Sequence, residues 1–276
     1  MRAFRAVATV LTMSVALAGC GGGGNDDGGD GAQTTTTAGA TTVPVLTTVG
    51  AASGPATELT LRVTDVRLVN SEESDNGVRI LLPAGVATAS VTLSGLPTPN
   101  RVISVCQARE LDRRQSGAAC RNPTNGEAVT VTLGTAASGV EIVQLGTVNA
   151  GPEGNSAALE EIVVRYTAPS REVNVRLAQI AGGDTGGRPT FTLSPAGTTG
   201  NYRAKLSWTS IPVFGGTPPS AQVELLRDGT PTQTQAAGAN AEISGTISPP
   251  GGNLAVRVQN TGTAALVAPK LELLLP

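Results

Sequence analysis

From residue 57 onward, apolar and polar residues alternate along most of the chain. The stretch TELTLRV at 57–63 places its leucines and valine on one face of an extended strand and its polar residues on the other. The same two-residue period recurs in AVTVTL, EVNVRL, NYRAKLSW, EISGTI, NLAVRV and KLELLL. Such alternation is typical of antiparallel strands that bury one face and expose the other.

Some segments interrupt this alternation. In DVRLVN at 65–70 the apolar positions change parity, which predicts a bulge or break near Thr64 and Asp65. Clusters of glycine and proline such as GGTPP and SPPGG predict turns between the strands. Ser156–Glu161 is the best candidate for a helix, and that helix is short.

The pattern predicts an all-β protein with two tandem antiparallel β-sandwich domains of the jelly-roll or immunoglobulin-like type. A weak internal repeat marks the boundary, because Leu81–Pro97 and Leu193–Pro212 each contain Pro-Ala-Gly, an alternating strand and a proline turn. The glycine-rich stretch AGGDTGG separates the two copies. We therefore expect one domain at 57–180 and a second at 188–276.

The first residues differ in character from the rest. Two arginines precede an apolar run that ends at Gly19 and Cys20, which is the pattern of a secretory signal peptide at 1–19. The run is shorter than the roughly 20 apolar residues that a membrane-spanning helix needs. Residues 20–56 consist mainly of glycine, threonine, serine and alanine, so we expect a disordered tether there.

Leu17, Ala18, Gly19 and Cys20 resemble the lipobox of bacterial lipoproteins. The resemblance implies that Cys20 carries a diacylglyceryl group, that the signal peptide is cleaved before it, and that palmitate or similar chains anchor the protein. The expected location is the cell envelope, on the extracytoplasmic side of the membrane. The other interpretation is an ordinary signal peptide whose Cys20 is incidental or oxidised.

Charge and composition limit the function classes. The chain has 19 basic and 21 acidic residues, and no basic stripe that would follow a nucleic acid backbone, so we expect no nucleic acid partner. The absence of histidine rules out Ser-His-Asp and Cys-His catalytic sets and zinc sites that need imidazole. We find no phosphate-binding loop or nucleophile elbow, and we expect no enzyme activity, metal or cofactor.

Cys106 and Cys120 remain after Cys20 is assigned to the lipid. An even number of cysteines in an exported chain predicts one disulfide, and two free thiols are the alternative. The segment between and beside them contains a set of arginines, Arg109, Arg113, Arg114 and Arg121. They form either a recognition loop that the disulfide pre-orders or a solvated surface loop.

Aromatic residues are scarce, which disfavours the aromatic platforms that sugar-binding sandwiches use. Trp208 shares the parity of Leu206 and Tyr202, so we expect it in the core. Phe214, in IPVFGGTPP, is placed for exposure and is a candidate contact residue. Paired carboxylates such as Glu160 and Glu161 point apart if they lie in a strand.

In the second half, YRAKLSW ends in a tryptophan and is followed by AQVELLRDG and then NLAVRV. This order resembles the jelly-roll sandwich of the bacterial pre-peptidase C-terminal domain, and the resemblance implies that fold. Gln222 and Glu224 occupy positions where that family often has aspartates, and Leu254 one where it often has tyrosine. We therefore carry over the fold and no ligand role.

These features together predict a lipid-anchored exported bacterial protein that displays two β-sandwich domains for binding, adhesion or cell-envelope structure. The expected partners are the membrane, through the lipid, and a protein or other component of the envelope. The alternatives are an accessory module of an exported enzyme complex and a hydrolase that uses carboxylates alone.

Overall fold

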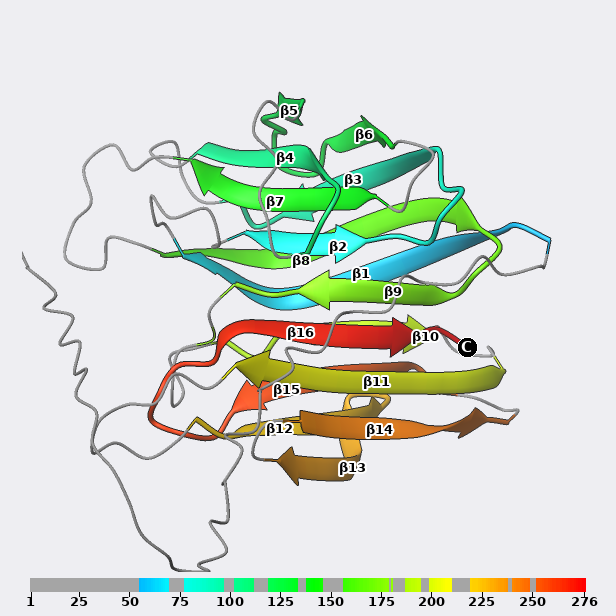
Figure 1. Ribbon diagram of the computed structural model, residues 1–276, viewed down its shortest axis with the longest axis vertical. Helices are drawn as coiled ribbons and strands as arrows, with labels where there is room; N and C mark the ends of the chain where they lie inside the picture. Colours follow the sequence, from blue (N-terminus) through cyan, green and yellow to red (C-terminus); the bar gives the residue numbers. More distant parts are fainter. Residues whose placement is uncertain are drawn as a thin grey trace, which may run out of the picture. The chain divides into compact units, whose positions relative to one another are not determined.

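The structure is a computed structural model that describes residues 55–69, 77–96, 102–111, 119–133, 138–145, 156–178, 180, 187–194, 199–209, 219–237, 240–248 and 252–276. These residues form β-strands and the turns between them (Figure 1). Within these ranges there is no helix, and hence none with the length and hydropathy to cross a membrane.

The strands belong to two antiparallel sheets, which we call sheet A and sheet B. In spatial order, sheet A consists of β13 (Thr230–Ala237), β12 (Ala221–Arg227), β15 (Leu254–Asn260), β10 (Thr190–Ser194), β1 (Thr57–Val69), β8 (Ser156–Ala168), β3 (Thr88–Ser94) and β6 (Ala128–Thr132). Sheet B consists of β14 (Asn240–Ile247), β11 (Gly200–Thr209), β16 (Val267–Leu274), β9 (Glu172–Arg176), β2 (Val78–Leu81), β7 (Gly139–Leu145), β4 (Val102–Ala108) and β5 (Cys120–Arg121). The predicted all-β class with antiparallel sandwich packing is confirmed.

Each sheet contains strands from both halves of the chain. In sheet A, β1 from the first half pairs with β10 from the second, and Val63 lies opposite Phe191. In sheet B, β9 pairs with β16, and Val175 lies opposite Leu271. Hydrogen-bonded pairing therefore continues across the predicted boundary, while the division into two domains stays a prediction.

The alternating strands bury one face in a single hydrophobic cluster between the sheets. The inward residues of β1 and β9, such as Leu61 and Val175, belong to the same cluster as Phe191 and Leu206 of the second half. Trp208 is also in this cluster and is 7% exposed, so its predicted core position is confirmed. Burial of these apolar side chains is the main favourable contribution to the fold.

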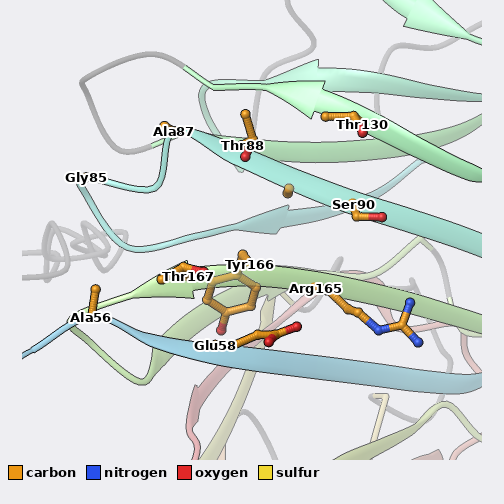
Figure 2. A pocket seen from close by; sticks show the side chains of 11 residues that line it. Ala56, Glu58, Gly85, Ala87, Thr88, Ser90, Thr130, Arg165, Tyr166 and Thr167 are labelled. Carbon is orange, nitrogen blue, oxygen red and sulfur yellow. The ribbon is translucent and has the colours of Figure 1, made fainter.

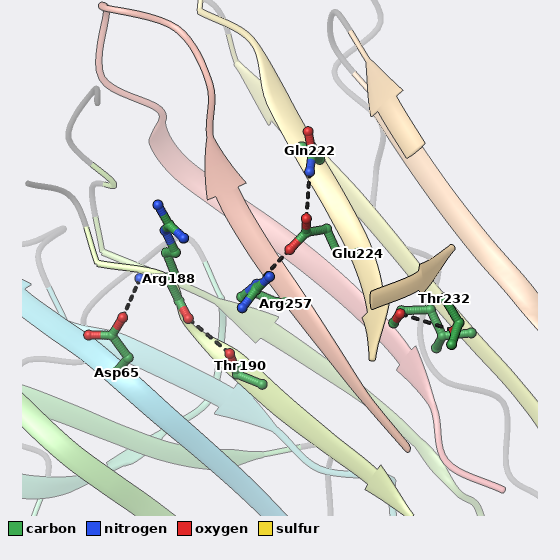
Figure 3. Close-up of polar contacts among 8 residues, drawn as sticks. Asp65, Arg188, Thr190, Gln222, Glu224, Thr232 and Arg257 are labelled. Atoms are coloured by element: carbon green, nitrogen blue, oxygen red, sulfur yellow. Dashed lines mark hydrogen bonds and ion pairs between the residues drawn. The ribbon is translucent and has the colours of Figure 1, made fainter. Parts of the chain in front are cut away.

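The predicted irregularity near Asp65 is present within a continuous strand. Asp65 has a φ of 54°, in the left-handed region, and pairing with β8 resumes at Val66 opposite Leu159. The Asp65 carboxylate accepts a hydrogen bond from the backbone N–H of Arg188 at 2.6 Å (Figure 3). The parity change lets β1 keep its apolar side chains in the core on both sides of this residue.

The helix predicted at Ser156–Glu161 is wrong, because these residues begin β8. The local sequence SAALEE contains good helix formers, but its residues pair with β1 at every position except Glu160. Leu159 is buried in the core opposite Val66. Tertiary pairing with a neighbouring strand therefore outweighs the local preference.

Candidate functional site

The cysteine pair lies at the edge of sheet B. Cys106 of β4 and Cys120 of β5 are register partners, with their Cα atoms 4.1 Å apart, and their sulfur atoms form a disulfide. The predicted bridge is confirmed. It closes the segment that contains most of the predicted arginine set.

The structure places only part of that set. Arg109 and Arg121 are exposed, and neither makes a hydrogen bond or ion pair within the described ranges. Arg113, Arg114 and Phe214 lie outside the described residues, as do the lipobox with Cys20 and the tether. The recognition loop therefore stays a prediction.

The start of the disulfide-closed segment covers a buried ion pair that sequence reasoning missed. Arg79 of β2 is fully buried, and its Nε donates a hydrogen bond to Glu141 Oε1 of β7 at 2.9 Å. Arg79 Nη1 also donates to the backbone carbonyl of Leu111 at 2.9 Å. Because Val78 and Ile80 point into the core, Arg79 lies on the opposite face of sheet B, beneath the chain that follows β4.

The pair belongs to a polar row across that outer face. Register pairing aligns Lys270, Arg176, Arg79, Glu141, Cys106 and Cys120 on consecutive strands. Arg176 and Glu141 are also buried. The disulfide thus lies at the end of a row of charged side chains, and the described start of the segment that it closes contacts this row where Leu111 accepts a hydrogen bond from Arg79. The sequence contains a weak signal of this row, namely a single charged residue inside each of the apolar stretches VRIL and GVEIVQL.

A second polar region forms a hollow on the outer face of sheet A, with a volume of about 510 Å³ (Figure 2). Four neighbouring strands and the turn before β3 surround it. Its polar lining consists of Glu58 of β1, Thr88 and Ser90 of β3, Thr130 of β6, and Arg165 and Thr167 of β8. We call this region the sheet A hollow.

Strand register explains why these side chains gather. Thr130, Ser90 and Arg165 are register partners on β6, β3 and β8, so they form one row. Glu58 lies opposite Thr167 in a neighbouring row. Thr88 is two residues before Ser90 and therefore points to the same face. The turn that bounds the hollow contains Gly85 with a φ of 91°, a conformation that favours glycine.

Beneath the hollow, Tyr166 alternates with Arg165 and Thr167 and points into the core. It is 3% exposed, and burial raises the pKa of its hydroxyl above the ordinary value. The hydroxyl has no hydrogen-bond partner among the described residues. The described lining therefore offers hydroxyls and charges, and the ring of its one aromatic residue is covered.

A third polar group occupies the outer face of sheet A in the second half (Figure 3). Glu224 accepts hydrogen bonds from Arg257 Nε at 2.5 Å and from Gln222 Nε2 at 2.7 Å. Both carboxylate oxygens of this buried residue therefore have protein partners. Among the described residues no group of three or more acidic, cysteine or histidine side chains is arranged to hold a metal ion.

No family model and no curated protein matches the sequence. Among solved structures, an insecticidal delta-endotoxin from Bacillus thuringiensis is similar at 10% identity and a TM-score of 0.24, over 80% of this chain and 53% of that one. A chain from a structure of the infectious bursal disease virus Gx strain is similar at 14% identity and a TM-score of 0.20, over 79% of this chain and 69% of that one. The N-terminal tandem CBM22 domain of Xyn10C from Paenibacillus barcinonensis is similar at 10% identity and a TM-score of 0.18, over 72% and 79%. The chain spans about half the length of the endotoxin, and likenesses at these TM-scores carry no functional argument.

Proposed function

We propose that the chain is an exported lipoprotein whose β-sandwich body serves as a binding or structural module on the extracytoplasmic side of the bacterial cell membrane. The Cys106–Cys120 disulfide carries this proposal, because structural disulfides persist outside the reducing cytosol. The sequence LAGC at 17–20 adds the acceptor thiol for a lipid. A diacyl or triacyl anchor holds a protein at a membrane where one chain does not.

The body supports a role in binding through its rigid polar surfaces. The side chains of the sheet A hollow extend from four hydrogen-bonded strands, so their spacing is fixed by register. Preorganised groups of this kind lower the entropy lost when a ligand binds. The proposal assigns binding to this sheet and membrane attachment to Cys20.

The lipid anchor is tested by growing a bacterial host that expresses the full-length chain with radioactive palmitate. We expect label on the wild-type chain, and loss of the label together with release from the membrane fraction in Cys20→Ala. Cys106→Ser is the matched control. We expect it to retain the label, because in the wild type the Cys106 sulfur is bonded to Cys120 and accepts no lipid. Label that persists unchanged in Cys20→Ala would contradict the proposal.

A further inference from the structure

Two charged residues of the sheet A hollow have no partner among the residues that the structure describes. Glu58 of β1 and Arg165 of β8 make no hydrogen bond or ion pair within the part of the chain that the structure describes. Both are exposed, and Figure 2 shows the guanidinium and the carboxylate as separate groups along the hollow, with Ser90 on the neighbouring strand. Each charge is therefore available to a ligand.

The same two strands contain an equivalent pair that does close. Arg62 of β1 lies opposite Val163, and its Nη1 donates a hydrogen bond at 2.8 Å to Oε1 of Glu161, which is two residues before Val163 on β8. Glu58 lies opposite Thr167, and Arg165 has the same diagonal relation to it. Diagonal neighbours lie within reach of long side chains, so register alone does not keep Glu58 and Arg165 apart. The hollow thus presents a separated anion site and cation site.

The chemistry of these groups selects the ligand. Arginine binds carboxylates through parallel N–H bonds, and a carboxylate accepts hydrogen bonds from an ammonium group. A simple anion at Arg165 would be opposed by Glu58, and a simple cation at Glu58 would be opposed by Arg165. A zwitterion satisfies both, and the hydroxyls of Ser90, Thr88 and Thr130 can donate or accept along its length.

The hollow suits a peptide better than a sugar ring. Sugar rings commonly stack on exposed aromatic faces, and Tyr166, the one aromatic residue in the described lining, is buried. Peptide amides need only the donors and acceptors that threonine and serine provide. Three extended residues span about 10 Å. This length is comparable to the distance that the side chains of two diagonal residues on neighbouring strands cover between them.

We infer that the sheet A hollow binds a short zwitterionic peptide or amino-acid derivative, with its carboxylate held by Arg165 and its ammonium group by Glu58. The hydroxyls of β3 and β6 bind the segment between the two ends. This ligand class rests on the proposed role of the β-sandwich body as a binding module, and it is independent of the lipid on Cys20.

Isothermal titration of the purified full-length chain with trialanine tests the inference. We expect trialanine with free ends to bind, and N-acetyl or C-amide capping to weaken binding about tenfold each, because each cap removes one charge. Arg165→Gln should lose sensitivity to the C-amide cap alone. Glu58→Gln should lose sensitivity to the N-acetyl cap alone.

Arg62→Gln is the matched control, because it removes an arginine from the same face of β1 outside the hollow. We expect its affinity for trialanine to equal that of the wild type. Circular dichroism confirms that each exposed-site variant is folded.

Three results would overturn the inference: no heat of binding at about 10 mM trialanine, a concentration well above a dissociation constant of 1 mM, which corresponds to about −4 kcal/mol; equal affinity for free and doubly capped peptide; or tighter binding of glucuronate than of trialanine. None of these results bears on the labelling of Cys20 with lipid, which is tested separately. The failure of the ligand is therefore distinguishable from the failure of the proposed anchor.

Discussion

The Arg79–Glu141 and Arg62–Glu161 pairs each bridge neighbouring strands and differ mainly in burial. Arg79–Glu141 in sheet B is almost completely buried, whereas the Arg62 and Glu161 side chains in sheet A are 43% and 29% exposed. Their hydrogen bonds are nearly equal in length, at 2.9 and 2.8 Å. The pairs therefore separate the effect of burial from the effect of geometry.

Glu141→Gln should lower the free energy of unfolding by about 3 kcal/mol, because it removes the Glu141 charge that faces the buried Arg79 guanidinium. The matched change Glu161→Gln should cost less than about 1 kcal/mol, because water screens that pair. Urea denaturation followed by circular dichroism measures both values.

The double replacement Arg79→Met with Glu141→Leu should recover most of the lost stability, since it removes both buried charges together. Equal costs for Glu141→Gln and Glu161→Gln would show that burial does not govern this pair. The same result would also contradict the interpretation that the chain near Leu111 shields the Arg79–Glu141 pair from water.

Sequence reasoning identified the residues that alternate in polarity but missed the residues that pair at long range. Arg79 and Glu141 are 62 positions apart, and each looks like a single charged interruption of an apolar strand. Glu58 and Arg165 look like ordinary outward positions of TELTLRV and VVRYTA. Which charges meet depends on strand order and register, and neither is encoded in local alternation.

At the scale of single strands, local alternation predicted most of the elements, because the two-residue period follows directly from strand geometry. It failed at β8, where helix-forming residues in SAALEE are held extended by β1. The internal repeat also did not mark equivalent strands. Its copies lead into β3 of sheet A and β11 of sheet B, which occupy different sheets.

The short strand β5 depends on the disulfide more than on pairing, since it comprises only Cys120 and Arg121 and both are exposed. Replacing Cys106 and Cys120 together with serine should lower the free energy of unfolding by about 3 kcal/mol, as expected for a loop of this length. Thermal denaturation with and without dithiothreitol measures the effect. The wild type should lose a similar amount of stability on reduction, whereas the double serine variant should be insensitive to the reductant.

A loss of less than about 0.5 kcal/mol in the serine variant would show that the bridge hardly lowers the entropy of the unfolded chain. It would then follow that β4 and β5 stay paired without the bridge. Trialanine binding serves as an internal control in this experiment. The sheet A hollow contains no residue of β4 or β5, so its affinity should be unchanged.

At the scale of the whole body, the two halves of the chain share both sheets and one hydrophobic cluster. The sequence predicted sandwich packing but not this continuity, because β1 and β10 are far apart in the chain and pair only through the fold. Strand pairs across the boundary couple the stability of one half to that of the other. Unfolding of the described strands should therefore occur in one cooperative transition.

Leu93 and Trp208 make this coupling measurable. Leu93 is fully buried on β3, which two strands, β1 and β8, separate from β10 of the second half. Leu93→Ala should cost about 2–5 kcal/mol. Trp208, the one tryptophan, lies on β11 and reports on the second half through its fluorescence. If the halves unfold together, Leu93→Ala shifts the Trp208 transition as far as it shifts the circular dichroism transition. A Trp208 transition that stays at the wild-type midpoint, while circular dichroism splits into two steps, would show that the second half folds independently and that the shared sheets add little coupling.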